Sequence, residues 1–263
     1  MTRLSHTFGC GSLKLVGTLD TAPGRTGMLI VSGGNEIRSG AFGGQAQIAA
    51  RIAQAGFPVF RFDRRGIGDS EGENRGFRHS AKDISSALGA FRAMAPQMSR
   101  VVAFGNCDAA SALMLTGGSG CDGLVLSNPW TIEPDQSENA TSNMPPPAAI
   151  RARYLSKLKN PREIIRLVSG GVNLGKLVRG IRTALQPSAP VTDLAQDMAA
   201  GLTGFTGSVR ILLATADRTA QVFEASWDAA DPRISRCEGA GHSYVDPVHR
   251  DWLYAQLLAS LRT

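Results

Sequence analysis

Five short, mostly apolar runs separated by stretches with helical spacing constrain the fold of this chain more than any other feature of its sequence. The runs cover residues 27–31, 57–62, 100–104, 123–126 and 209–214, and the helical stretches between them include Gln45 to Gln54, Ser80 to Met94 and Ala109 to Thr116. Strands that are apolar on both sides are typical of a parallel sheet with crossover helices on both faces. The sequence therefore predicts an α/β fold with a mostly parallel sheet and flanking helices.

The two ends of the chain extend this prediction. Leu13 to Leu19 alternates apolar and polar side chains, which predicts an antiparallel edge strand paired through a turn with Ser5 to Gly9. Trp252 to Leu261 repeats leucine at helical spacing and should pack as a helix on the sheet. A chain of 263 residues is long enough for one such domain with an insertion.

The alternation of strands and helices breaks between Asn128 and about Gly207, where prolines mark a loop and helical stretches follow. We therefore expect an α/β core formed by residues 1–128 and 208–263, and a helical cap inserted at residues 129–207. Residues 150–183 contain nine basic side chains and one acidic side chain, a net charge of +8. Since the whole chain carries +6, all of the net positive charge lies in the predicted cap.

A sharp turn is predicted directly after the run at 100–104, where the chain reads Gly105-Asn106-Cys107-Asp108-Ala109. In the G-x-S-x-G nucleophile elbow, small residues on both sides let the chain bend and raise the central side chain above the sheet. Here cysteine replaces the serine and Ala109 replaces the second glycine. A lone motif of this form is weak, because a buried cysteine in such a turn is common.

Two residues further along the chain strengthen the interpretation of Cys107 as a nucleophile. Asp217 follows the strand at 209–214, and His242 lies in a glycine-rich loop after the strand-like run Ile234 to Cys237. The chain order nucleophile, acid, base is the order that this arrangement requires. Asp217 as a helix cap and His242 as a solvated loop residue are the structural alternatives.

An oxyanion hole needs two N–H donors. The first should be the backbone N–H of Asp108, at the start of the helix after Cys107. The second should come from Ser32-Gly33-Gly34-Asn35-Glu36, from the backbone of Asn35 or Gly34. Because a carboxylate facing the sulfur would oppose thiolate formation, we expect the Asp108 side chain to point away or to bind a backbone or basic group.

Several other polar residues are interpreted without a catalytic role. The charged, glycine-rich stretch from Asp63 to Gly72 predicts a tight loop held by hydrogen bonds of Asp63 or Arg65. His6, His79 and His249 are predicted to be solvated or capping residues, so no metal site and no cofactor are expected. The four cysteines show neither zinc-ligand nor disulfide spacing, which favours a reducing cytoplasm. Since the first residues are polar and no apolar run reaches roughly 18 residues, we expect a soluble or at most peripheral protein.

Together, the elbow at 105–109, Asp217, Gly241-His242 and the Asp63-Arg64-Arg65-Gly66 loop resemble the α/β-hydrolase superfamily over nearly the whole chain. More narrowly, the segments Gly33-Gly34, Arg38-Ser39-Gly40, 56–63 and 107–111 resemble the family of exosortase A system-associated hydrolase 1. That resemblance implies an intracellular hydrolase encoded beside exopolysaccharide and protein-sorting machinery, with an undefined substrate. Ala109 and the stretch Ala41-Phe42-Gly43-Gly44 depart from the family pattern.

The leading functional hypothesis is a cysteine-dependent hydrolase that acts on an ester or thioester through an acyl intermediate on Cys107, assisted by His242 and Asp217. An acyltransferase with the same three residues stays open, because a thioester can pass its acyl group to another acceptor. Arg38, Arg151 and Arg153 are candidates for binding a small or carrier-linked acyl substrate, which an anionic group would suit.

A second hypothesis is a non-catalytic scaffold that contacts the inner membrane through the basic cap, where Ile164 and Ile165 lie beside arginines. The structural alternative is that the cap charges simply solvate exposed helices. Nucleic-acid binding is not expected, because the basic segment offers only Tyr154 for stacking on bases.

Overall fold

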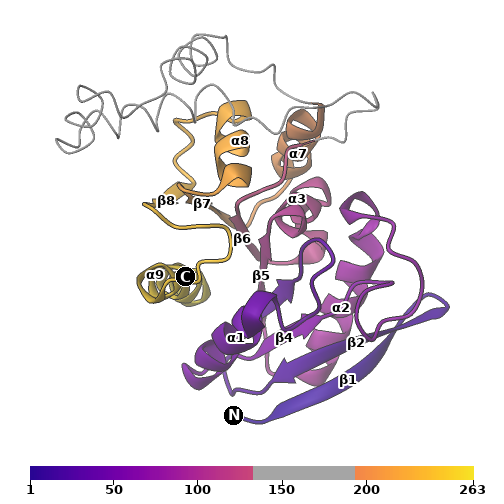
Figure 1. Ribbon diagram of the computed structural model, residues 1–263. Coiled ribbons are helices and arrows are strands. Elements are labelled where there is room, and N and C mark those ends of the chain that lie inside the picture. The colour runs from indigo at the N-terminus through magenta and orange to yellow at the C-terminus, as the bar shows by residue number, and fades with distance from the viewer. Residues whose placement is uncertain (133–192) are drawn as a thin grey trace, which may run out of the picture.

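The computed structural model of the protein describes residues 1–132 and 193–263. In these residues one sheet has the strand order β1-β2-β4-β3-β5-β6-β7-β8 (Figure 1). The strands are β1 (Arg3–Cys10), β2 (Leu13–Asp20), β3 (Thr26–Val31), β4 (Val59–Phe62), β5 (Arg100–Asn106), β6 (Gly123–Ser127), β7 (Ser208–Ala214) and β8 (Ile234–Cys237). From β4 to β8 all neighbours are parallel, while β2 pairs antiparallel with β1 and β4. The predicted α/β fold with a mostly parallel sheet is confirmed.

Strand β2 does not lie at the edge of the sheet, although its alternating pattern predicts that position. The alternation in Leu13 to Leu19 predicts an edge strand, but β2 lies between β1 and β4, and β1 forms the edge. Two of its polar side chains are buried against partners: Thr18 accepts a hydrogen bond from Arg38, and Asp20 binds Arg61. A polar residue in the pattern therefore marks a buried ionic contact here and not a solvated face.

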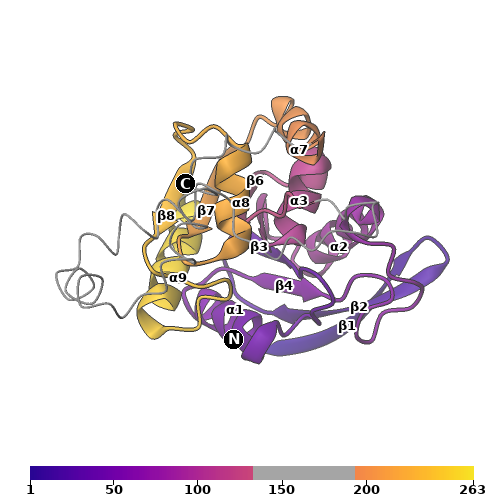
Figure 2. The ribbon, with the colours of Figure 1, turned by 45° about the horizontal axis from the view of Figure 1, so that its top comes forward.

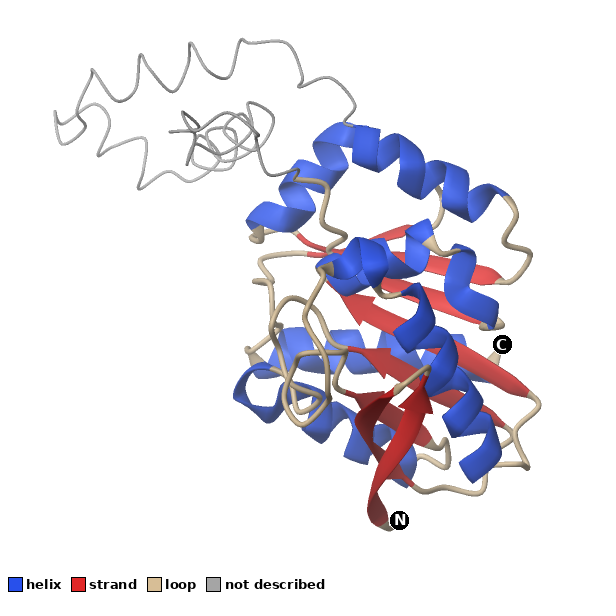
Figure 3. Cartoon of the chain, turned by 90° about the vertical axis from the view of Figure 1, so that its right-hand side faces the viewer, coloured by secondary structure: helices blue, strands red, loops and turns tan. Residues whose placement is uncertain are grey.

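Helices cover both faces of the sheet (Figures 2 and 3). One face carries α1 (Gly44–Gln54) and α9 (Pro247–Arg262), and the other carries α2 (Ala81–Met94), α3 (Asp108–Leu115), α7 (Asp193–Thr203) and α8 (Arg218–Ser226). Short 3₁₀ turns lie at Ala41–Gly43, Phe77–His79 and Gly117–Gly120. The predicted helices at 45–54, 80–94, 109–116 and 252–261 are thus confirmed within a few residues.

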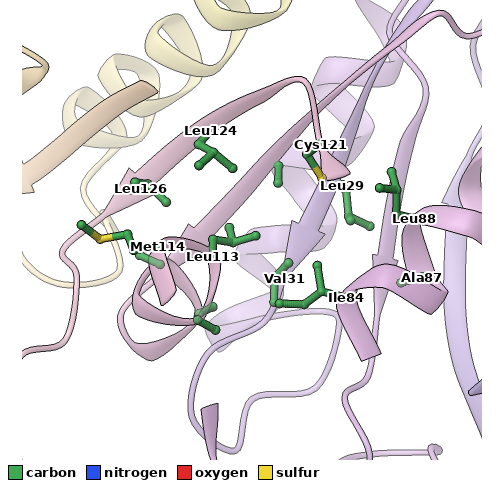
Figure 4. Packing of buried hydrophobic residues seen from close by; sticks show 14 of the residues in the cluster. Leu29, Val31, Ile84, Ala87, Leu88, Leu113, Met114, Cys121, Leu124 and Leu126 are labelled. Carbon is green, nitrogen blue, oxygen red and sulfur yellow. The ribbon is translucent and has the colours of Figure 1, made fainter. Parts of the chain in front are cut away.

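Strand β3 shows how the apolar runs divide between the two faces. Met28 and Ile30 pack in the cluster under α1 and α9, whereas Leu29 and Val31 pack under α2 and α3, where Ile84 meets them (Figure 4). Successive side chains of a strand point to opposite faces, so a strand between two helical layers must be apolar at every position. Full burial of one such side chain stabilises the fold by about 1.5–3 kcal/mol.

Part of the segment expected to form the cap belongs to the core. Helix α7 lies within residues 129–207, but its side chains Leu194, Met198 and Leu202 are buried in the cluster beside α3. They follow one another at intervals of four residues and so form one apolar stripe. Residues 133–192, which include the basic segment, lie outside the described residues. No described helix is both long and apolar enough to cross a membrane.

The carboxyl ends of β3, β5, β6, β7 and β8 meet along one edge of the sheet, since these strands are parallel and adjacent or nearly so. In open α/β sheets this edge is where ligands bind. The loops that leave it begin at Ser32, Cys107, Asn128, Thr215 and Glu238. Every residue singled out as a candidate nucleophile, acid, base or oxyanion donor lies on one of these loops or directly after its strand.

Candidate active site

Cys107 lies at the turn between β5 and α3 with φ 62° and ψ −129°. Residues other than glycine seldom adopt a positive φ, and such strain occurs mostly at functional sites. The turn is tight enough that a Cβ on Gly105 would lie 2.7 Å from the carbonyl carbon of Ala109. The methyl group of Ala109 is accommodated in the core, where it is fully buried. The structure therefore contains a strand–elbow–helix turn of the predicted form, with alanine in place of the second glycine.

Asp217 makes both of the contacts that its sequence context left as alternatives. It is the N-cap of α8, where its Oδ2 accepts a hydrogen bond from the Ala220 N–H at 3.2 Å. The same oxygen lies 2.9 Å from Nδ1 of His242. Since an ionised carboxylate only accepts hydrogen bonds, Nδ1 carries the proton. The helix cap thus holds the carboxylate in the place from which it orients the imidazole.

His242 brings the three candidate residues together. Its pKa is raised to about 10, first by the hydrogen bond to Asp217 and next by a hydrogen bond to the side chain of Cys107, while burial acts in the opposite direction. The imidazole therefore lies between a carboxylate and a sulfur. Its side chain keeps 35% of its surface exposed, so a molecule from solution can approach it.

Two asparagines that the sequence patterns did not single out hold the backbone of the His242 loop. The side-chain amides of Asn106 and Asn128 each donate to the His242 carbonyl at 3.3 Å, and Asn128 also donates to Asn106 Oδ1 at 3.0 Å. The Oδ1 of Asn128 accepts the Ala214 N–H at 2.8 Å, so the clamp is tied to β7. Both asparagines stand at the carboxyl end of a strand, and that position was the signal available in the sequence.

The loop after β3 is bound to the elbow. Asp108 Oδ1 accepts the Gly34 N–H at 2.6 Å, and Asp108 Oδ2 lies 3.4 Å from the guanidinium of Arg64. The prediction that this carboxylate binds a backbone or basic group is confirmed. The same contact counts against the Gly34 N–H as an oxyanion donor, because that hydrogen is already engaged. Within the described residues, the Asn35 N–H has no hydrogen-bond partner.

The arginine expected to bind substrate at this edge has other partners. The guanidinium of Arg38 binds the buried carboxylate of Asp63, Asp69 Oδ2 at 2.8 Å and Thr18 Oγ1 at 3.0 Å. The carboxylates of Asp63 and Asp69 thereby balance the charge of Arg38, which argues against a role of Arg38 in substrate binding. The loop is also held by Arg65, which pairs with Asp83, as the interpretation of a structural loop predicts. Arg151 and Arg153 lie outside the described residues.

A pocket opens beside the elbow, between the loop after β3, α1, the His242 loop and α9. Its apolar lining comes from Ala41, Ile48, Phe104 and Leu253, and its polar lining includes Glu36, Gln45, Asn106, Ser243 and Arg250. Burial raises the pKa of Glu36, and the nearby charge of His242 acts against this rise. Glu36 is a further polar group near the imidazole that the sequence patterns did not single out. Among the described residues no group of three or more metal-binding side chains is present.

Comparison with known proteins agrees with this architecture. The family model described as serine aminopeptidase, S33 (Hydrolase_4) matches residues 24–224. No curated protein matches the chain. Among solved structures, an α/β hydrolase, GrgF, from Penicillium sp. sh18 is 17% identical with a TM-score of 0.64 and covers 100% of this chain and 98% of its own.

Two further solved structures are similar to this chain, with comparable sequence identity and TM-score. The esterase Pf2001 of Pyrococcus furiosus is 13% identical with a TM-score of 0.60, covering 99% of this chain and 91% of that one. XC6422 of Xanthomonas campestris, described as an α/β serine hydrolase without lid, is 12% identical with a TM-score of 0.57, covering 100% and 94%. The family description specifies serine, whereas residue 107 here is cysteine. The family match over most of the chain and the shared fold show that this protein belongs to the serine aminopeptidase, S33 (Hydrolase_4) family of α/β hydrolases.

Proposed function

We propose that this protein is a cysteine-dependent hydrolase of esters or thioesters, with Cys107 as the nucleophile. His242 donates and accepts protons, and Asp217 holds its imidazole in the required tautomer. The backbone N–H groups of Asp108 and Asn35 bind the oxyanion. The observation that carries the proposal is the position of the His242 imidazole between the Asp217 carboxylate and the Cys107 side chain.

The position of His242 beside residue 107 suits a thiol. A free thiol loses its proton far more readily than a serine hydroxyl, and a neighbouring imidazolium stabilises the resulting thiolate, which is the reactive form of cysteine. The thiolate attacks the substrate carbonyl carbon, a carbon–sulfur bond forms, and the bond to the leaving group breaks as imidazolium protonates that group. The neutral imidazole then takes a proton from water, which attacks the thioester and releases the acid and the Cys107 thiolate.

The sequence resemblance to exosortase A system-associated hydrolase 1 supports a role in exopolysaccharide metabolism in the cytoplasm, but it leaves the substrate undefined. The basic segment at residues 150–183 supports an anionic substrate or peripheral contact with the inner membrane. A panel of p-nitrophenyl esters and acyl thioesters with neutral and anionic carriers tests this, and equal rates across the panel would contradict a preference for anionic carriers.

The mechanism is tested by intact mass spectrometry after mixing the protein with p-nitrophenyl acetate. Wild-type protein should gain one acetyl group that decays with turnover, and Cys107→Ala should gain none. Cys107→Ser is the matched control, because it places an oxygen nucleophile beside the same His242. This variant should be acylated much more slowly. An acetyl group that persists in Cys107→Ala would contradict the proposal.

The same experiment separates hydrolysis from transfer and from a scaffold role. Added alcohols or amines that shorten the life of the adduct and appear acetylated would indicate an acyltransferase. Absence of any adduct, together with sedimentation on anionic liposomes, would favour the scaffold.

A further inference from the structure

We propose that Arg64 and Asp108 are positioning residues that select the Asn35 N–H as the second donor of the oxyanion hole, by binding both sides of Gly34. This inference rests on the proposed function, since it assigns the loop that would stabilise the oxyanion formed during attack by Cys107.

The two residues bind the two peptide groups on either side of the Gly34 Cα. Asp108 Oδ1 accepts the N–H of Gly34 at 2.6 Å, and the guanidinium of Arg64 donates to the carbonyl of Gly34 at 2.7 Å. Arg64 also lies 3.4 Å from the other oxygen of the Asp108 carboxylate, so the two residues are joined to each other. Neither peptide group of Gly34 is free to rotate without breaking one of these contacts.

The carbonyl of Gly34 and the N–H of Asn35 belong to the same peptide group. In a planar trans peptide these two groups point in opposite directions. When Arg64 holds the carbonyl, it therefore fixes the direction of the Asn35 N–H, which has no partner among the described residues. The Gly34 N–H is taken by Asp108, so of the two donors expected from this loop, Asn35 is the one that remains for a developing oxyanion.

Arg64 and Asp108 make further close contacts around Gly34. Arg64 is 4% exposed, and its guanidinium also donates to Ser80 Oγ at 3.1 Å. Gly34 has φ +54°, which favours glycine, and a Cβ on Gly33 would lie 3.0 Å from Asp108 Oδ1. Asp108 thus contributes twice to the proposed oxyanion hole, since its own N–H is the first donor and its carboxylate removes a competing donor.

Two reactions of the same sulfur separate this role from an effect on the nucleophile. Alkylation by iodoacetamide displaces iodide from a saturated carbon and forms no oxyanion, whereas acylation by p-nitrophenyl acetate passes through a tetrahedral oxyanion. Both rates are measured by intact mass, first on wild type and then on Arg64→Gln. Arg65→Gln is the matched control, because Arg65 is the next residue in the loop and pairs with Asp83 without touching Gly34.

We expect Arg64→Gln to acylate about 10-fold to 100-fold more slowly than wild type, since complete removal of one oxyanion donor costs about 100-fold to 1,000-fold. Its alkylation rate should stay close to that of wild type, and Arg64→Lys should recover part of the acylation rate. In Arg65→Gln the ratio of the two rates should not change.

An equal fall of both rates in Arg64→Gln, or an unchanged acylation rate, would overturn the proposal. Asp108→Ala supplies a second test that does not require Arg64→Gln to fold. It frees the Gly34 N–H and should lower the ratio of acylation to alkylation, and an unchanged ratio would also overturn the proposal. If wild-type protein is alkylated but never acylated, the proposed function fails instead, so the two failures are distinguishable.

Discussion

The Asp63 loop and the His242 site both place carboxylates beside basic side chains at the carboxyl ends of strands, but they differ in how completely those charges are satisfied. Asp63 is fully buried and accepts hydrogen bonds from the Arg38 N–H at 2.5 Å, the Arg38 guanidinium and the Asp69 N–H at 3.2 Å. The imidazole of His242 has one carboxylate partner, faces a sulfur, and remains 35% exposed.

This difference separates a structural ionic cluster from a site that can react. Both carboxylate oxygens of Asp63 accept hydrogen bonds, so a substrate could bind this carboxylate only by breaking strong contacts. In the His242 site, Asp217 holds one side of the imidazole, and the other side is directed to the sulfur of Cys107, the proposed nucleophile. Backbone strain follows the same division, because the positive φ of Cys107 occurs at the His242 site.

Asp217→Asn should produce the largest effect. The asparagine oxygen can still cap α8 and accept the Nδ1 hydrogen of His242, so the fold should persist, but the neutral amide loses the negative charge that stabilises the imidazolium. Turnover of p-nitrophenyl acetate should fall by about a thousandfold or more, equivalent to about 4 kcal/mol of transition-state stabilisation. Asp217→Ala is the comparison, since it also removes the cap and should lose about 1 kcal/mol of unfolding free energy. Near-normal turnover in Asp217→Asn would remove Asp217 from the mechanism.

Asp63→Asn should produce the opposite result, a loss of stability with little change in chemistry. The amide nitrogen that replaces one carboxylate oxygen would face the hydrogen-bond donors of Arg38 or Asp69. The half-buried guanidinium of Arg38 would also lose the buried negative charge of its partner. We expect a loss of about 3 kcal/mol in urea unfolding. Asp69→Asn is the matched control, because Asp69 binds the same guanidinium but is 67% exposed, and it should cost at most about 1 kcal/mol. Equal losses in the two variants would show that burial does not distinguish these carboxylates.

The smallest expected effect is a pH dependence of stability at His242. Its pKa in the folded protein, about 10, lies above the ordinary value of 6.5. The protonated form therefore stabilises the fold fully below about pH 6.5, and this contribution is lost as the pH rises through about 10. In urea unfolding, the difference in unfolding free energy between wild type and His242→Gln should shrink between pH 7 and pH 10.5. The change should be small, because solvent screens the interactions of this partly exposed imidazole. A gap that stays constant with pH would contradict the raised pKa.

Much of the fold was predictable because it depends on local patterns. Apolar runs, helical spacing and small residues at turns place β5, the elbow and α3 correctly, and they place Asp217 and His242 directly after their strands. The alternation in β2 was misleading, since Thr18 and Asp20 are polar but buried against arginines. Polar residues in an alternating pattern indicate an exposed face only when no buried partner binds their side chains.

The candidate site also has features that the sequence predicted and features that it did not. Local sequence patterns were enough to predict the strands, the elbow and the chain order of Cys107, Asp217 and His242, because propensity and turn chemistry act over a few neighbouring residues. The folded arrangement was needed to show that Asp108 occupies the Gly34 N–H, that Arg38 binds Asp63, and that Asn106 and Asn128 hold the His242 carbonyl. These contacts join loops that are far apart in the chain, and the partner of a hydrogen bond depends on which loops the folded sheet brings together.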